Sequence, residues 1–366
     1  MRRFDKKGED DIMKRILLIP VGGTICTALT GHGTRAVYES AGLQLKSDFL
    51  SSESPFAAQI EIDTAENLMI LSENMTPECW DRMLSVYREK TAQQSYDGVI
   101  LAHGTDTLAY SASLLAMLLA DTDIPIFLVS SCLPLSSPKA NGTDNFRCAA
   151  ECIGYGIEPN VYVPYRNVSD GVMYLHLGSR LRQCAGYSDD FFSVGAVAFA
   201  SSDKDGYARA LACVKERFPS EKRRPAFDGK RVSSLSARVL KLTPYVGMDY
   251  DAYDVSRFDA VLHGAYHSGT ACAESEIDCR SLRHFADRCA RAGVDVYLSP
   301  SKAEGEVYES VRLLSKQEAC GRPIRFLYGF TDEAAYAKLV LAYSLCETDG
   351  ERERFLKEEC NFERIV

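Results

Sequence analysis

The sequence lacks any apolar run long enough to cross a membrane. Its most apolar stretches, residues 16–21 and 114–120, are far shorter than the roughly 20 residues that a bilayer requires. The first 14 residues are polar and charged, and no apolar segment that resembles a secretory signal precedes Ile16. We therefore expect no membrane partner and a cytoplasmic location.

Positive charge is also scarce relative to negative charge. The chain carries 42 Lys and Arg residues against 51 Asp and Glu residues, which gives a formal net charge of −9 at pH 7. Proteins that bind a phosphate backbone need a basic surface, because each phosphate carries a negative charge. The charge balance therefore argues against a nucleic-acid partner.

Several patterns that mark cofactor and metal sites are missing. The chain has 13 cysteines but no Cys-x-x-Cys pair, and the odd, scattered set favours reduced thiols over disulfides. The patterns Gly-x-Gly-x-x-Gly, the P-loop and Gly-x-Ser-x-Gly are absent as well. His263, His267 and Cys272 are metal-ligand types at loose spacing, and a packed or hydrogen-bonded His263 is the simpler expectation. We predict no metal and no cofactor.

The composition and length are those of a globular protein with two domains. Of the 366 residues, 46% are hydrophobic and 25% are charged. The stretch at residues 216–233 is polar, basic and proline-bearing, which is typical of a linker. We predict a larger N-terminal domain over residues 1–215 and a smaller C-terminal α/β domain over residues 234–366.

Short apolar runs alternate with amphipathic stretches along the chain, a pattern that favours parallel strands joined by helices. The predicted fold class is α/β, with a doubly wound, mostly parallel sheet in the N-terminal domain. Strands are predicted at residues 15–21, 96–102, 124–130, 160–165, 238–243, 258–263 and 294–298, and helices at 76–90, 108–119, 145–155, 278–292 and 331–345. The charged tail at residues 347–366 is predicted to be helical.

Two polar turns follow predicted strands of the N-terminal domain. Gly-Gly-Thr occupies residues 22–24, and His-Gly-Thr-Asp-Thr occupies residues 103–107. Ligands bind at the carboxyl ends of strands in open parallel sheets, where free N–H groups can hold an oxyanion and a hydroxyl can attack a carbonyl. Taken singly, each motif also fits a tight turn followed by a helix cap. Together they favour acyl transfer.

These motifs resemble the bacterial-type L-asparaginases, including the glutaminase-asparaginases. Val-Gly-Gly-Thr-Ile at residues 21–25 and His-Gly-Thr-Asp-Thr-Leu-Ala-Tyr at 103–110 are most similar to the cytoplasmic type I branch. The resemblance covers roughly residues 16–345, with further similar segments at 72–78, 133–135, 145–146, 178–193 and 332–339.

The resemblance implies hydrolysis of a side-chain amide to a carboxylate and ammonia through a threonine acyl-enzyme. Thr24 is then the nucleophile, with Tyr38 on a lid loop beside it, and Thr105 is the second essential threonine. Asp106 holds the α-ammonium group of the substrate, and Ser72 its α-carboxylate. The implied partners are a small-molecule amino-acid amide and further copies of the chain, in a homodimer or homotetramer.

Two of the departures from the family pattern bear on the chemistry of the site, whereas a third, Ala-Asn-Gly at residues 140–142, concerns packing near it. The family has a lysine that activates the second threonine, and Gln183 stands in its place here. Glutamine is neither a base nor a charge, and losing a general base typically costs about 10²–10⁴-fold in rate. Glu73 stands where the family has an uncharged residue, and adds negative charge on the α-ammonium side of the expected substrate site.

These departures leave two other interpretations open. The chain fits a non-catalytic or weakly active homologue that binds or senses an amino acid. It also fits the asparaginase-like subunit of an archaeal-type tRNA-dependent amidotransferase, which uses the same ammonia-releasing chemistry. We rank the amidotransferase interpretation lower, because only about fifteen residues precede Ile16 and the net charge disfavours tRNA.

Overall fold

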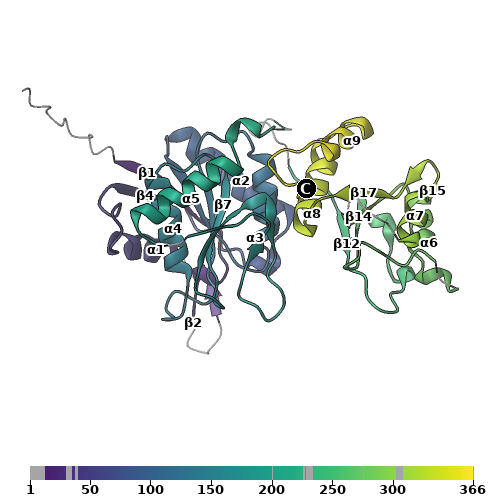
Figure 1. The fold of residues 1–366 in the computed structure, drawn as a ribbon, viewed down its shortest axis with the longest axis horizontal. Coiled ribbons are helices and arrows are strands. Elements are labelled where there is room, and N and C mark those ends of the chain that lie inside the picture. Colours follow the sequence, from purple (N-terminus) through teal and green to yellow (C-terminus); the bar gives the residue numbers. More distant parts are fainter. Residues whose placement is uncertain are drawn as a thin grey trace, which may run out of the picture.

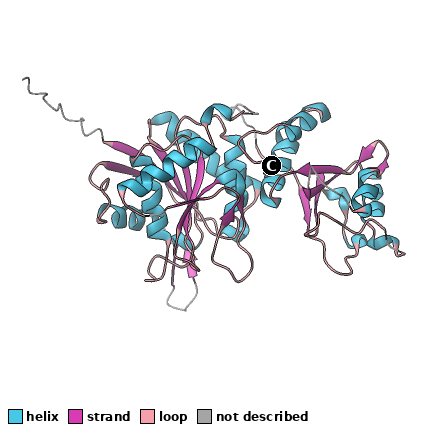
Figure 2. Ribbon diagram, in the orientation of Figure 1, coloured by secondary structure: helices cyan, strands magenta, loops and turns pink. Residues whose placement is uncertain are grey.

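The computed structural model describes residues 13–29, 35–37, 40–199, 201–225, 227, 234–274, 276–301 and 308–365. Two β-sheets, each flanked by helices, lie side by side along the long axis of the molecule (Figures 1 and 2). Tyr38, predicted on the lid, lies outside the described residues. None of the helices in these ranges is long and apolar enough to span a membrane.

The larger sheet has seven strands in the order β11-β8-β7-β6-β5-β1-β4. The strands from β4 to β7 in this order are parallel, and β8 and β11 are antiparallel at the opposite edge. The predicted mostly parallel sheet is thus confirmed. The bounds are β1 (Lys14–Pro20), β4 (Ile60–Thr64), β5 (Gly98–Ala102), β6 (Ile126–Val129), β7 (Val161–Arg166), β8 (Met173–Leu177) and β11 (Val197–Ala198).

Helices cover both faces of this sheet, because its central strands are apolar on both sides. In β1, Leu17 and Ile19 pack into one core with α2 and α3, while Ile16 and Leu18 pack into another with α1, α4 and α5. The bounds are α1 (Ala41–Leu50), α2 (Pro77–Gln93), α3 (Leu108–Leu118), α4 (Gly142–Gly154) and α5 (Lys204–Arg217).

The smaller sheet is parallel throughout, in the order β12-β13-β14-β17. Its strands are β12 (Val239–Leu242), β13 (Ala260–Gly264), β14 (Asp295–Ser301) and β17 (Arg325–Tyr328), with α6 (Leu282–Arg291) and α7 (Glu309–Ser315) beside them. Short antiparallel pairs complete the described strands: β2 (Thr27–Leu29) with β3 (Arg35–Val37), β9 (Leu181–Arg182) with β10 (Phe192–Ser193), and β15 (Glu318–Ala319) with β16 (Arg322–Pro323).

Most predicted elements are present, with shifted ends. The helix predicted at residues 145–155 begins earlier, at Gly142, and the one predicted at 278–292 is divided into a short 3₁₀ turn and α6. The strands β4, β8, β11 and β17 were not predicted, and the tail predicted to be helical over residues 347–366 forms a helix only at Asp349–Lys357. Residues 226 and 228–233 of the predicted linker are outside the described ranges, so the domain boundary stays a prediction.

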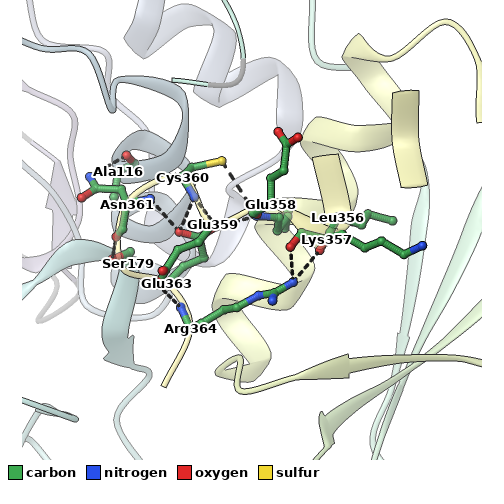
Figure 3. A network of polar contacts seen from close by, with 11 residues as sticks. Ala116, Ser179, Leu356, Lys357, Glu358, Glu359, Cys360, Asn361, Glu363 and Arg364 are labelled. Atoms are coloured by element: carbon green, nitrogen blue, oxygen red, sulfur yellow. Dashed lines mark hydrogen bonds and ion pairs between the residues drawn. The ribbon is translucent and has the colours of Figure 1, made fainter. Parts of the chain in front are cut away.

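The C-terminal part of the chain returns to the larger sheet. Helix α8 (Asp332–Leu345) lies between the two sheets in Figure 1 and contributes to the same core as α3, and α9 (Asp349–Lys357) follows it. Beyond α9 the chain enters a buried polar network, shown in Figure 3. The Asn361 side chain donates to the Ala116 carbonyl at 2.8 Å, and the Ser179 hydroxyl donates to the Asn361 carbonyl at 2.5 Å.

An ion pair with no exposed surface holds this tail in place. Lys338 Nζ lies 2.5 Å from Glu363 Oε1, and both side chains are 0% exposed. Burial opposes the ionisation of Glu363, yet Lys338 and the backbone N–H groups of residues 360 and 361 hold its pKa below the ordinary value. The pair therefore stabilises the fold at neutral pH, and its contribution is lost as the pH falls through the lowered pKa of Glu363.

We expect Lys338→Ala to lower the free energy of unfolding by about 3 kcal/mol, because it leaves the Glu363 charge buried without its partner. Urea denaturation at pH 7 measures this change. The matched control is Lys357→Ala, since Lys357 lies 2.6 Å from Glu353 with both side chains exposed. The control should lose less than about 1 kcal/mol, and equal losses in the two variants would contradict the prediction.

Candidate active site

The two polar turns lie next to each other at the carboxyl edge of the larger sheet. Strands β1 and β5 are paired in parallel, and their last residues, Pro20 and Ala102, are opposite each other. Past the end of β1, the backbone N–H groups of Val21 and Gly22 both donate to the Ala102 carbonyl, at 2.8 and 3.2 Å. The turns at 22–24 and 103–107 therefore leave the sheet side by side.

Gly23 and Gly104 form the point of contact between the turns. A Cβ atom built on Gly23 would lie 2.0 Å from Gly104 Cα, and one built on Gly104 would lie 2.4 Å from Ser72 Oγ. Gly23 also has a φ of 73°, which favours glycine. Only residues without a side chain allow this approach, so the Gly-Gly and His-Gly pairs explain how three loops converge.

Gly23→Ala should lower the free energy of unfolding by at least about 2 kcal/mol, because the new methyl group collides with backbone that cannot move aside. Thermal or urea denaturation measures the loss. Gly156→Ala is the control: Gly156 has a φ of 75° but no atom within 4 Å of the built Cβ. The control isolates the cost of the backbone conformation, about 1 kcal/mol. A loss at Gly23 no larger than this would contradict the predicted collision.

Of the three residues predicted to bind substrate, Ser72, Glu73 and Asp106, the first and the last are in direct contact. Ser72 begins a 3₁₀ turn, Ser72–Asn74, after Ile70, which pairs with Gly22. The Ser72 hydroxyl donates to Asp106 Oδ2 at 2.8 Å. The Thr107 hydroxyl donates to the Ser72 carbonyl at 3.0 Å, which fastens the second turn to this loop. Ser72 is buried and Asp106 is exposed.

The two predicted catalytic threonines are both half-buried, one in each turn. Thr24 begins a 3₁₀ turn, Thr24–Cys26. Its backbone carbonyl accepts a hydrogen bond from the Thr27 hydroxyl at 2.9 Å. Thr105 lies next to Gly104, at the contact between the turns. Glu73 is exposed beside Ser72. The arrangement gathers hydroxyl, carboxylate and backbone donor groups at one edge of the sheet.

Gln183 lies against the second turn, at the Thr105 carbonyl. It follows β9, and its Nε2 donates to the Thr105 carbonyl at 2.6 Å. Its Oε1 accepts from the backbone N–H of Ala109 at 3.3 Å. The neighbouring Arg182 side chain is 56% exposed. The glutamine amide thus joins Thr105 to the first turn of α3.

Sequence reasoning missed two residues beside the turns. His103 is fully buried, and its Nδ1 lies 2.8 Å from the Gly104 carbonyl oxygen. Burial lowers the pKa of His103 to about 4, so the ring is neutral at pH 7. Glu333 is buried in the first turn of α8 and accepts the backbone N–H of Gln183 at 3.0 Å. His103 is the first residue of the second motif, but the motif alone does not indicate that its ring is fully buried. Glu333 is 150 residues from Gln183 in sequence, so no local signal indicates its place.

Metal-ligand residue types are gathered elsewhere. Asp249, Asp251 and Cys279 place potential ligand atoms within 4.8 Å of one another, in the smaller unit. Asp251 is already paired with Arg288. His263 is buried and its Nε2 lies 2.8 Å from the Tyr250 hydroxyl, which confirms the expected hydrogen-bonded histidine.

Comparison with known proteins places these motifs in a family. The family model described as "Asparaginase, N-terminal" matches residues 15–205. The chain belongs to the asparaginase family. The family was expected from the two threonine motifs, and the α/β fold from the alternation of apolar runs with amphipathic stretches.

The relatives of the chain include proteins of two kinds. One of the subunits of glutamyl-tRNA(Gln) amidotransferase from Halobacterium salinarum is 30% identical over 202 residues, 55% of this chain and 46% of that protein. The L-asparaginase of Thermococcus kodakarensis is 30% identical over 151 residues, 41% of this chain and 44% of that one. The chain thus spans about half the length of these curated relatives. They include the amidotransferase component that sequence reasoning ranked lower.

Solved asparaginase structures share the fold. The thermostable L-asparaginase from T. kodakarensis aligns with a TM-score of 0.68 at 22% identity, covering 96% of this chain and 99% of that one. L-asparaginase I from Vibrio cholerae aligns with a TM-score of 0.66 at 22% identity and the same coverage. The shared fold covers both sheets of the present structure.

Proposed function

We propose that the protein is an asparaginase-like amidohydrolase that hydrolyses the side-chain amide of L-asparagine, or of a related amino-acid amide. The observation that carries the proposal is the contact of Gly23 with Gly104, which brings the residues next to them, Thr24 and Thr105, to one edge of the sheet. The Ser72–Asp106 hydrogen bond adds a polar pair at the same edge.

The proposed reaction has two halves. The Thr24 hydroxyl oxygen attacks the amide carbon and gives up its proton, the C–N bond breaks, and the nitrogen leaves as ammonia with that proton. Water then attacks the resulting ester, which restores the Thr24 hydroxyl and releases the carboxylate. Backbone N–H groups of the turn can stabilise the oxyanion that forms in each half.

The remaining residues bind the amino acid in this proposal. Asp106 accepts charge-assisted hydrogen bonds from the α-ammonium group, and the exposed position of its carboxylate allows that contact. Ser72, which already donates to Asp106, contributes its hydroxyl on the α-carboxylate side. Thr105 assists the first threonine. Glu73 adds negative charge beside Ser72 and favours substrates with extra positive charge.

Gln183 favours a second candidate function, binding of an amino acid without turnover. Its amide is engaged with the Thr105 carbonyl and the Ala109 N–H, and an amide cannot take a proton from a hydroxyl at neutral pH. The amidotransferase relatives suggest a further use of the same reaction, in which an acceptor consumes the ammonia. In either case the ligand is an amino-acid amide in the same site.

An ammonia-release screen separates these functions. The purified protein is incubated with L-asparagine, L-glutamine, D-asparagine and a peptide amide, and the same ligands are titrated by calorimetry. Ammonia from one of them without a partner protein supports the hydrolase. Binding without ammonia supports the binding protein, and the absence of both contradicts the proposed site. Light scattering tests the homodimer or homotetramer that we expect.

A further inference from the structure

Glu333 is a buried carboxylate that the proposed mechanism does not use. It is the second residue of α8, whose start is capped by the Thr331 hydroxyl accepting from the Ala334 N–H at 3.1 Å. Glu333 is only 4% exposed. Glutamate is rarely buried to this extent without a partner, because removing a carboxylate from water is costly. Its surroundings therefore need an explanation.

The carboxylate is only partly compensated. Glu333 Oε1 accepts the backbone N–H of Gln183 at 3.0 Å, while Oε2 has no hydrogen-bond partner among the residues that the structure describes. The Arg182 guanidinium lies 3.8 Å from Oε2, but its side chain is 56% exposed and offers a weak ion pair. Burial raises the pKa of Glu333. An apolar residue would avoid this cost, so stability alone does not account for the glutamate.

The hydrogen bond that Glu333 accepts from the Gln183 backbone connects it to the candidate site. The N–H that it accepts belongs to Gln183, whose side chain donates to the Thr105 carbonyl at 2.6 Å. The same amide accepts from Ala109, which supplies one of the N–H groups that the start of a helix leaves without a partner. A series of hydrogen bonds thus runs from the Glu333 carboxylate to the Gln183 backbone, and from the Gln183 side-chain amide to the turn that contains Thr105.

We propose that Glu333 is a positioning residue for Thr105 and acts through Gln183. This inference rests on the proposed function for its catalytic consequence, but its structural part concerns only the turn. By holding the Gln183 backbone, the carboxylate sets where the glutamine amide meets the Thr105 carbonyl. A residue from the C-terminal part of the chain thereby controls the geometry of a turn in the larger sheet.

Steady-state kinetics on an amide found in the screen tests the catalytic consequence. We expect Glu333→Ala and Gln183→Ala each to lower kcat about 10-fold, the equivalent of one lost hydrogen bond, with KM changed less than about 2-fold. If both residues act through the same series of hydrogen bonds, kcat of the double variant should be no lower than kcat of either single variant. Glu333→Gln keeps an acceptor oxygen and should stay within about 3-fold of wild type.

A matched control separates this role from general damage to the core. Glu151 is also a buried glutamate, 5% exposed, on α4. Glu151→Ala should leave kcat within about 2-fold of wild type. The inference would be overturned if the two losses in kcat multiplied in the Glu333→Ala/Gln183→Ala double variant. It would also be overturned if Glu151→Ala lowered kcat as much as Glu333→Ala does.

Hydrogen exchange measured by mass spectrometry tests the inference without turnover. Exchange in a peptide covering residues 103–109 should accelerate at least about 5-fold in Glu333→Ala and in Gln183→Ala, but not in Glu151→Ala. In Gln183→Ala the Ala109 N–H loses its acceptor, and in Glu333→Ala that acceptor is no longer held in position. If wild type releases no ammonia, the proposed hydrolase fails and exchange alone decides the positioning role. Acceleration in Gln183→Ala with none in Glu333→Ala would overturn it.

Discussion

Thr24→Ala is expected to abolish ammonia release from any amide that the wild-type protein hydrolyses, by at least about 10⁴-fold. The reason is that the covalent route disappears with the attacking hydroxyl, and only binding and oxyanion stabilisation remain. The fold should tolerate the change, because among the described residues Thr24 is bonded through its backbone carbonyl, which accepts from the Thr27 hydroxyl. A coupled ammonia assay under single-turnover and steady-state conditions measures the loss.

Thr24→Ser is the matched control for this prediction. Serine keeps the hydroxyl and loses only a methyl group, so turnover should remain measurable well above that of the alanine variant. Calorimetry on the alanine variant should still show amino-acid binding, since Ser72 and Asp106 are intact. Unchanged ammonia release by Thr24→Ala would remove Thr24 from the mechanism.

Gln183→Lys is expected to raise kcat/KM by about 10²–10⁴-fold, the usual contribution of a positioned general base. The wild-type amide lies 2.6 Å from the Thr105 carbonyl, so a longer amine in its place would reach the same turn. The effect is a gain of function, which unfolding or loss of packing cannot mimic. The same ammonia assay is run from pH 6 to 10. In the lysine variant, the rate should rise with pH as the introduced amine loses its proton and becomes able to act as a base.

Two further substitutions distinguish proton transfer from charge. Gln183→Arg supplies a positive charge but no base, because the pKa of the guanidinium group is too high. Gln183→Met supplies neither a charge nor a base. Only the lysine variant should gain turnover. A gain of equal size with arginine would assign the effect to charge. No gain with lysine, in a protein that still binds asparagine, would show that Gln183 does not stand in the place of the base.

Much of the larger sheet and of its candidate site could be predicted because the signals are local. The apolar runs at residues 15–21 and 96–102 have no polar face, as expected of central parallel strands. Each run ends in a glycine-bearing turn, and parallel pairing then brings both turns to one edge. The contact of Gly23 with Gly104 follows from residue types that are visible in the sequence.

Contacts between distant parts of the chain could not be predicted in this way. Glu333 reads as an ordinary acidic residue in the first turn of a helix, and nothing near it in sequence indicates that it accepts from Gln183. Lys338 likewise reads as a surface lysine, although it is fully buried against Glu363. The antiparallel strands β8 and β11 are short and carry mixed residues, so periodicity is too weak to identify them.

The hydrogen bond between Asn361 and Ala116 has a consequence for the order in which the protein folds during translation. Ala116 lies in the last turn of α3, where a helix leaves carbonyl groups without partners, and the Asn361 amide supplies the donor. A ribosome finishes every strand of the larger sheet long before it reaches that asparagine. Nascent chains that stop short of Asn361 therefore lack both the donor to the Ala116 carbonyl and the acceptor for the Ser179 hydroxyl, so these contacts form only after Asn361 has been synthesised.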